Sequence, residues 1–426
     1  MTTGRIAGPV AAWAATRAVL LLLVFRVISV SDLDVTSDVH VIYQGWYGVL
    51  RTGSFPVDDV SWQYPPAAAL AILSPALLPF LEYAHAFFVL ACVADAIAFA
   101  VFLRAGTRPG RSLAGAWVWI AGVALLGPTA YARYDLMVTA LAVGALFLLV
   151  KHPRAGGALA AVGAMVKVWP ALLLLGTARG RDTRRAWTTA VVTAGAVAAA
   201  FALAMPGGFG FLTAQKDRGT EVESLGALVF HIARHHGWEG RVAFNYGSME
   251  FLGPGVETVS NIALALSIAA MLWLVLWRVR AREFTPTTLT DAAFAALLLF
   301  TTTSRVISPQ YMIWLVGLAA VALTLNAAHQ MLPAGLVLAA TALTLVEFPL
   351  YFGDVVGSTG FGIALMTARN GLLVVATVIA CRRLWRSTVS LKEAASEGSQ
   401  RRQPSWATRN DRQDAVNSAK STPSSF

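Results

Sequence analysis

Long segments with almost no charge are the feature that most limits what this chain of 426 residues can fold into. Only 13% of its residues are Asp, Glu, Lys or Arg, whereas soluble domains carry about 25%. Several apolar stretches approach the roughly 20 residues that a helix needs to cross a bilayer. A transmembrane β-barrel would show short segments of alternating hydrophobicity instead. The sequence therefore predicts an all-α fold, a polytopic bundle of transmembrane helices.

The spacing of the apolar stretches predicts about 10 to 12 membrane helices, including a short re-entrant pair. They form one domain over residues 1–386, and the polar residues 387–426 predict a disordered tail. No small-residue cleavage site follows the first apolar stretch, so we expect it to remain as a span. The other predicted spans follow in order at residues 84–103, 113–126, 136–150, 187–205, 259–276, 292–303, 312–325, 332–351 and 361–381.

Two arginines fall inside the first predicted span, residues 9–29. An intramembrane arginine is costly and usually faces a cavity or extends to the interface. We expect Arg17 to extend to the interface. Arg26 lies near the outer end of the span and is a candidate for the wall of a cavity.

Residues 155–178 predict the re-entrant pair. Basic residues flank the segment on both sides, and it is too short for two full spans at about 1.5 Å per residue. Pro170 lies near its middle, where a proline interrupts a helix. We therefore expect two short helices with Lys167 near the turn between them, pointing into a cavity.

Basic residues cluster in short loops, which predicts the orientation in the membrane. With the re-entrant pair in place, the clusters share one side, which is then cytoplasmic and holds both termini. The other side receives an acidic loop at residues 31–66, a long polar loop at 206–258, and the turns around Arg133 and Arg305. The basic clusters lie at residues 104–111, 151–154, 179–185, 278–282 and 382–386.

Several other classes of function find no support. The net charge of +10 follows from the basic loops and tail, so we expect no nucleic-acid partner. No glycine-rich phosphate loop, HExxH, CxxC pair or GxSxG is present. Cys92 and Cys381 lie in apolar runs and predict packing residues. Asp58 and Asp59 point apart on any regular backbone, so we interpret them as loop charge. We expect no metal and no cofactor.

A set of short motifs lies on the predicted extracytoplasmic side. The motifs are Asp38 to Tyr43 with Gly53 following, Tyr64-Pro65-Pro66, Arg133-Tyr134-Asp135, Lys167-Val168-Trp169-Pro170 and Ser308-Pro309-Gln310-Tyr311. Together they resemble glycosyltransferase family 87 of bacteria, common in actinobacteria and often α-mannosyltransferases. The resemblance implies a cell-envelope enzyme with a GT-C fold and a polyprenyl-phosphate-sugar donor.

By this resemblance, Asp38 corresponds to the acid in the first loop of GT-C enzymes, the general base. A sugar hydroxyl is a weak nucleophile, and a carboxylate can take its proton as the new bond forms. Asp34 is the competing candidate. The leaving lipid phosphate needs cations, for which Lys167, Arg305 and Arg133 are candidates. Direct displacement with one base implies inversion.

The remaining candidates for substrate contact are Tyr43, Tyr64, Asp135, Gln310 and Tyr311. Each has a structural alternative. The aromatic residues of the first loop can form an interfacial belt, Asp135 can pair with Arg133, and Gln310 with Tyr311 can simply begin a helix. Asp38 itself can be ordinary loop charge or a helix N-cap.

The predicted function is a cell-membrane glycosyltransferase that moves a sugar, mannose or else arabinofuranose, from polyprenyl phosphate to a lipid or glycan acceptor outside the cytoplasm. The alternative is a secondary transporter or a lipid or glycolipid flippase. Transporters place polar residues near the bilayer midplane and show internal repeats. Here the polar residues gather at one face without a clear repeat, which favours the enzyme.

Overall fold

A computed structural model describes residues 3–31, 33–214, 218–326 and 328–389. The chain is 71% helical with almost no strand, which confirms the predicted helical membrane bundle. Most of the predicted tail, residues 390–426, lies outside the described residues. Six described helices are long and apolar enough to cross a membrane. They are α1 (Thr3–Val24), α4 (Tyr83–Gly106), α8 (Arg181–Ala204), α11 (Val256–Arg280), α14 (Met331–Leu345) with its extension η5 (Val346–Leu350), and α16 (Gly360–Thr388).

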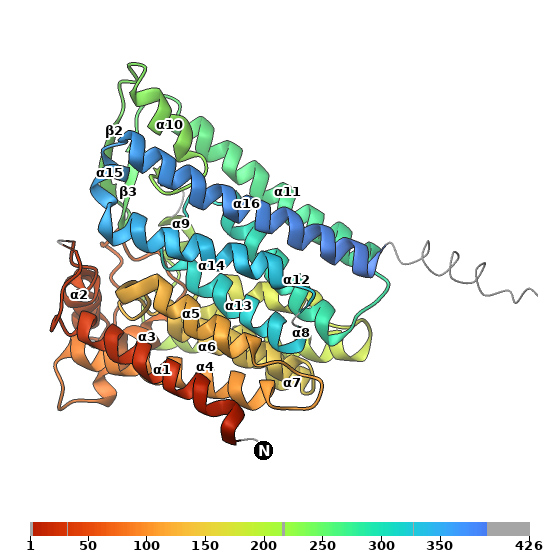
Figure 1. Cartoon of the computed structure of the whole chain (residues 1–426). Helices are drawn as coiled ribbons and strands as arrows, with labels where there is room; N and C mark the ends of the chain where they lie inside the picture. The colour runs from red at the N-terminus through yellow and green to blue at the C-terminus, as the bar shows by residue number, and fades with distance from the viewer. Residues whose placement is uncertain (1–2, 32, 215–217, 327, 390–426) are drawn as a thin grey trace, which may run out of the picture.

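Four shorter helices correspond to the other predicted spans. They are α5 (Ala114–Leu126), α6 (Asp135–Leu149), α12 (Pro286–Thr303) and α13 (Tyr311–Leu325). Helix α13 is buried from Met312 to Leu325, because it is apolar on every face and lies among the other helices (Figure 1). It approaches α5 closely at Gly122, where a Cβ atom would lie 2.2 Å from Val316.

The predicted re-entrant pair consists of α7 (Pro153–Val166) and the 3-10 helix η4 (Trp169–Gly176). Lys167 lies between them with extended backbone, φ −155° and ψ 128°. Two short helices therefore meet at this lysine, as the basic flanks and Pro170 predicted.

The two long loops are partly ordered into secondary structure. The first holds the π-helix η1 (Asp38–Tyr43) and α2 (Gln44–Leu50), and α3 (Ala68–Leu73) and η2 (Ser74–Leu77) follow it. The second holds α9 (Phe211–Ala214), β1 (Thr220–Glu221), α10 (Ala227–Arg234), β2 (Arg241–Asn245) and β3 (Ser248–Leu252), whose strands form an antiparallel sheet in the order β1-β3-β2. Figure 1 shows α2, α10, the sheet and α15 (Phe352–Val356) at one end of the bundle.

The basic loops gather at the opposite end, together with the N-terminus (Figure 1). Arg179 donates to the carbonyl of Val279 at 2.8 Å, and Arg278 donates to that of Thr177 at 2.8 Å. These contacts place two of the predicted basic clusters side by side. The side of the membrane that they face stays a prediction.

The prediction that Arg17 extends to the interface is wrong. Its side chain is only 2% exposed and binds Asp95 of α4 through Nε at 2.7 Å and Nη2 at 3.1 Å. A buried carboxylate neutralises the guanidinium in place, so the side chain has no need to reach water.

Candidate functional site

A cavity of about 700 Å³ lies at the end of the bundle opposite the basic loops. The central helices stop at its edge: α12 ends at Thr303 and α13 begins at Tyr311, and the turn between them lines the cavity. Asp135 contacts Lys167, a residue of the cavity wall. The other eight predicted site residues line the cavity: Asp38, Tyr43, Tyr64, Arg133, Lys167, Arg305, Gln310 and Tyr311.

Asp38 is the first residue of η1, and its side chain is 32% exposed. Arg133 lies 2.7 Å away, from Nη2 to Oδ2. The same guanidinium donates to the carbonyls of Val35 at 3.1 Å and Ala132 at 2.8 Å, so both the first loop and the turn before α6 fix its position. The N-cap of η1 is Ser37. Asp38 is therefore neither free loop charge nor the N-cap.

Lys167 and Asp135 form a second ion pair, with 2.6 Å between Nζ and Oδ1. The indole of Trp314 donates to the same oxygen at 2.7 Å. Four aromatic rings surround the ammonium at 4.9 to 5.8 Å from their centroids, those of Tyr64, Tyr134, Tyr311 and Trp314.

The alternative pairing of Arg133 with Asp135 is therefore wrong. Each of the two residues has a different partner. Arg133 lies in the turn before α6, whereas Asp135 is the first residue of the helix.

The competing acids of the first loop are bound elsewhere. Asp34 pairs with Arg26 and accepts from the Thr36 hydroxyl at 2.6 Å. Asp59 accepts from the Trp46 indole at 2.8 Å and from the Ser61 amide at 2.9 Å. Asp59 is thus a structural acceptor in the loop, which corrects its interpretation as simple loop charge.

Three aromatic residues of the first loop, Tyr43, Trp46 and Tyr64, form part of the cavity wall. Tyr43 and Trp46 are each 4% exposed and stack at 5.4 Å. Tyr64 meets Tyr134 edge to face at 5.4 Å. Burial raises the pKa of Tyr64 to about 12, so it stays a phenol that can donate a hydrogen bond.

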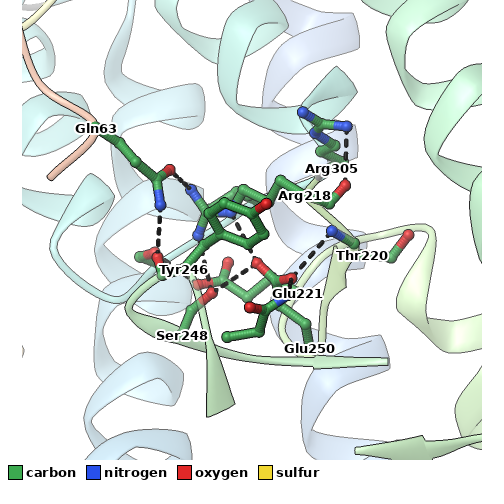
Figure 2. A network of polar contacts seen from close by, with 12 residues as sticks. Gln63, Arg218, Thr220, Glu221, Tyr246, Ser248, Glu250 and Arg305 are labelled. Carbon is green, nitrogen blue, oxygen red and sulfur yellow. Dashed lines mark hydrogen bonds and ion pairs between the residues drawn. The ribbon is translucent and has the colours of Figure 1, made fainter. Parts of the chain in front are cut away.

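Arg218 of the long loop was not among the predicted site residues. Its guanidinium binds Glu250 at 2.9 Å, Gln63 at 3.0 Å and Ser248 at 2.8 Å. Figure 2 shows it between Gln63 of the first loop and Glu250 of β3. Gln63 also donates to the carbonyl of Tyr246 at 2.8 Å. This network joins the two long loops across one wall of the cavity.

Backbone pairing brings Arg305 to this wall. Its carbonyl accepts from the Glu221 amide at 3.1 Å, and its guanidinium donates to the Arg218 carbonyl at 3.0 Å (Figure 2). Glu221 in turn accepts from the Ser308 hydroxyl at 2.8 Å and the Ile307 amide at 2.6 Å.

Gln310 and Tyr311 begin a helix and also line the cavity. Gln310 is the N-cap of α13, and Tyr311 is its first residue. The Tyr311 ring stacks on Trp314 at 3.9 Å. Their structural role at the start of α13 is therefore confirmed, and contact with substrate stays a prediction.

The acids and cations of the long loop were missed because the sequence offers only a weak signal for them. The clearest is a hairpin at Tyr246-Gly247, where both residues have positive φ, 47° and 78°. It predicts a paired β2 and β3, but it does not say that Arg218 binds there. Across the described ranges, no group of three or more His, Cys, Asp or Glu is placed to hold a metal ion.

The family model of glycosyltransferase family 87 matches residues 62–309, more than half of the chain. The matched range contains Tyr64, Arg133, Asp135, Lys167 and Arg305, and Asp38 precedes it. No curated protein and no solved structure matches the chain.

Proposed function

The chain belongs to glycosyltransferase family 87 and is a membrane glycosyltransferase, and we propose that its donor is a polyprenyl-phosphate sugar. The sugar is mannose, with arabinofuranose as the alternative, and the acceptor is a lipid or a glycan. The reaction takes place outside the cytoplasm, at the cell membrane, with both termini cytoplasmic. The separation of the cavity from the basic loops supports this orientation.

Asp38 is the proposed general base, and its setting in the cavity is the observation that carries the proposal. The side-chain contact described for this carboxylate involves Oδ2 and Arg133. Among the described residues, Oδ1 has no side-chain partner and can accept a proton from a bound hydroxyl group. Arg133 holds the carboxylate in place through Oδ2.

The proposed reaction is a direct displacement with inversion. The acceptor oxygen forms a bond to the anomeric carbon as the bond from that carbon to the phosphate oxygen breaks. The acceptor proton moves to Asp38, and the electron pair leaves with the lipid phosphate. Arg305, Lys167 and Arg133 line the same cavity and are the proposed cations that stabilise this leaving group.

The proposed substrate contacts come from the wall between these charges. Three polar residues of the wall are proposed to contact the substrate: Tyr64, Gln310 and Tyr311. Tyr43 lines the same cavity and stacks on Trp46, and Asp135 holds the ammonium of Lys167. Membership of a glycosyltransferase family argues against the transporter or flippase alternative.

The test is transfer from labelled polyprenyl-phosphate mannose by membranes that contain the wild type or Asp38→Asn. We expect the rate to fall about 100- to 10,000-fold in the variant, because the base is lost while the shape of the side chain is kept. The matched control is Asp58→Asn, an exposed acid of the same loop, which should retain the wild-type rate. A polyprenyl-phosphate arabinofuranose donor is assayed beside it.

Equal rates in the wild type and Asp38→Asn would remove Asp38 from the mechanism. Absence of transfer from both donors, in membranes that contain folded wild-type protein, would contradict the proposed donors.

A further inference from the structure

Two acids of the long loop, Glu221 and Glu223, line the cavity together with Asp38. They differ in what their carboxyl groups contact. Both oxygens of Glu221 are used by the turn between α12 and α13, through the Ile307 amide and the Ser308 hydroxyl. Glu221 therefore fixes the wall of the cavity.

One carboxyl oxygen of Glu223 is buried and forms no hydrogen bond within the described part of the chain. The residue is only 4% exposed, and its Oε1 atom has no hydrogen-bond partner among the described residues. Its backbone carbonyl is already used, accepting from Arg369 at 3.0 Å and from Asn370 at 3.3 Å. A buried polar atom without a partner is costly, so a ligand that supplies the partner gains affinity.

The nearest cation does not satisfy this oxygen. Nη2 of Arg369 lies 3.9 Å from Oε1, beyond hydrogen-bond distance. The guanidinium instead forms two bonds with Glu347, at 2.9 and 2.8 Å. One cation thus faces two acids, and Glu347 holds it.

The neighbouring acids affect the protonation of the Glu223 carboxyl group. Burial and the nearby Glu347 and Glu221 raise the pKa of its carboxyl group well above the usual value. A neutral carboxyl group both donates and accepts hydrogen bonds, as a sugar hydroxyl does. An anionic phosphate gains little beside two further acids, so this part of the wall suits the sugar.

The position of Glu223 relative to Arg305 favours the donor sugar over the acceptor. The amide of Glu221, two residues earlier, donates to the Arg305 carbonyl at 3.1 Å. Arg305 is a proposed ligand of the donor phosphate, and the donor sugar is covalently attached to that phosphate. The sugar therefore lies within reach of the same wall.

We propose that Glu223 hydrogen-bonds one hydroxyl group of the donor sugar, against a wall held by Glu221 and Ser308, and so selects which sugar is accepted. This inference rests on the proposed function, because it needs a sugar-phosphate donor in the cavity. A site built to bind a hydroxyl group discriminates strongly against an analogue that lacks it.

The experiment pairs variants with donors in a double-mutant cycle. Wild type, Glu223→Gln and Glu223→Leu are assayed with polyprenyl-phosphate mannose and with its 2-, 3-, 4- and 6-deoxy analogues. In the wild type, we expect one deoxy analogue to lose about 10- to 100-fold in kcat/KM from this contact. In Glu223→Leu that analogue should lose nothing further relative to mannose, while the other analogues keep their wild-type ratios. Glu223→Gln should stay within about 10-fold of the wild type, because an amide also donates and accepts.

Glu257→Leu, at an exposed acid on α11, is the matched control and should keep every wild-type ratio. If Glu223→Leu is not recovered folded, Glu223→Ala carries the same comparison and leaves room for a water molecule. A uniform loss across all donors would overturn the inference, because it would mean a structural role such as a water shared with Arg369. Unchanged ratios for every donor would overturn it too.

Failure of the proposed function gives a different result. If the folded wild type transfers sugar from none of these donors, the proposed donor is wrong and the inference falls with it. If the wild type uses the mannose donor and the ratios do not depend on Glu223, the inference alone fails.

Discussion

Two arginine–aspartate pairs in this protein differ in how fully the carboxylate is used. Asp95 lies between helices, and its two oxygens accept five hydrogen bonds. Two come from Arg17 and one each from Trp13, Trp119 and Tyr131, at 2.6 to 3.1 Å. Arg17 is 2% exposed and Asp95 is fully buried. No lone pair is left for a substrate, so this pair can only hold helices together.

Asp38 and Arg133 have the same chemistry in a different setting. Asp38 is 32% exposed in a cavity, and the described side-chain contact involves one of its oxygens. The guanidinium is held by backbone carbonyls, so the carboxylate is oriented without being saturated. The comparison suggests that unused capacity of a positioned acid, rather than the presence of an ion pair, marks a group available for chemistry.

The largest effect is expected from breaking the saturated pair. Asp95→Ala leaves the Arg17 guanidinium buried and unpaired, which typically costs about 3–5 kcal/mol of stability. We expect a large fall in the yield of folded protein and in the unfolding midpoint, measured in detergent. The double variant Arg17→Met with Asp95→Leu removes both charges but leaves Trp13, Trp119 and Tyr131 without their acceptor, so it should recover only part of the loss.

If Asp95→Ala unfolds at the wild-type midpoint, the saturated pair contributes little to stability, and the contrast drawn with Asp38 is wrong. Asp38→Asn should lower the midpoint much less, because its amide oxygen can still accept from Arg133, which also donates to two backbone carbonyls.

The pair of Lys167 and Asp135 combines a buried acid with a cation that lines the cavity. Asp135 is as buried as Asp95, yet Lys167 lines the cavity. Lys167→Met should lower kcat/KM about 10- to 100-fold if the ammonium contacts the donor phosphate, the loss expected for one charged hydrogen bond. Steady-state transfer and the unfolding midpoint are measured on the same preparations.

The double variant Lys167→Met with Asp135→Asn separates the two roles of this pair. It removes the unpaired buried acid, so we expect stability to recover while transfer stays low. Recovery of both would make the pair structural, like that of Arg17 with Asp95.

Features that depend on neighbours in sequence were predictable, and features that depend on distant partners were not. The short helices around Lys167 followed from segment length, basic flanks and Pro170, which are all local. Arg17 was misplaced because its partner lies 78 residues away on another helix. Hydropathy treats each span alone, so it cannot supply a buried counter-charge.

The candidate site shows the same division. Asp38, Arg133, Lys167 and Arg305 were predicted to share one side of the membrane, and all four line one cavity. Arg218 was missed because its partner Gln63 is 155 residues earlier in the chain. A polar loop of mixed charge carries no pattern that selects such a pair.

The smallest effect is expected from a pair outside both settings, His329 and Asp291 at the end of the bundle with the basic loops. Their distance is 2.7 Å, and His329 is 31% exposed. The hydrogen bond to Asp291 raises the pKa of His329 above its ordinary value. A raised pKa in the folded state means that the stabilisation is complete below about pH 6.5 and is lost as pH rises through the folded-state pKa. For a partly solvated pair we expect a stabilisation of no more than about 1 kcal/mol.

The unfolding midpoints of the wild type and His329→Gln should therefore differ slightly at about pH 6 and converge at about pH 9. Asp291→Asn should behave like His329→Gln. A difference that grows with pH would reverse the sign of this linkage.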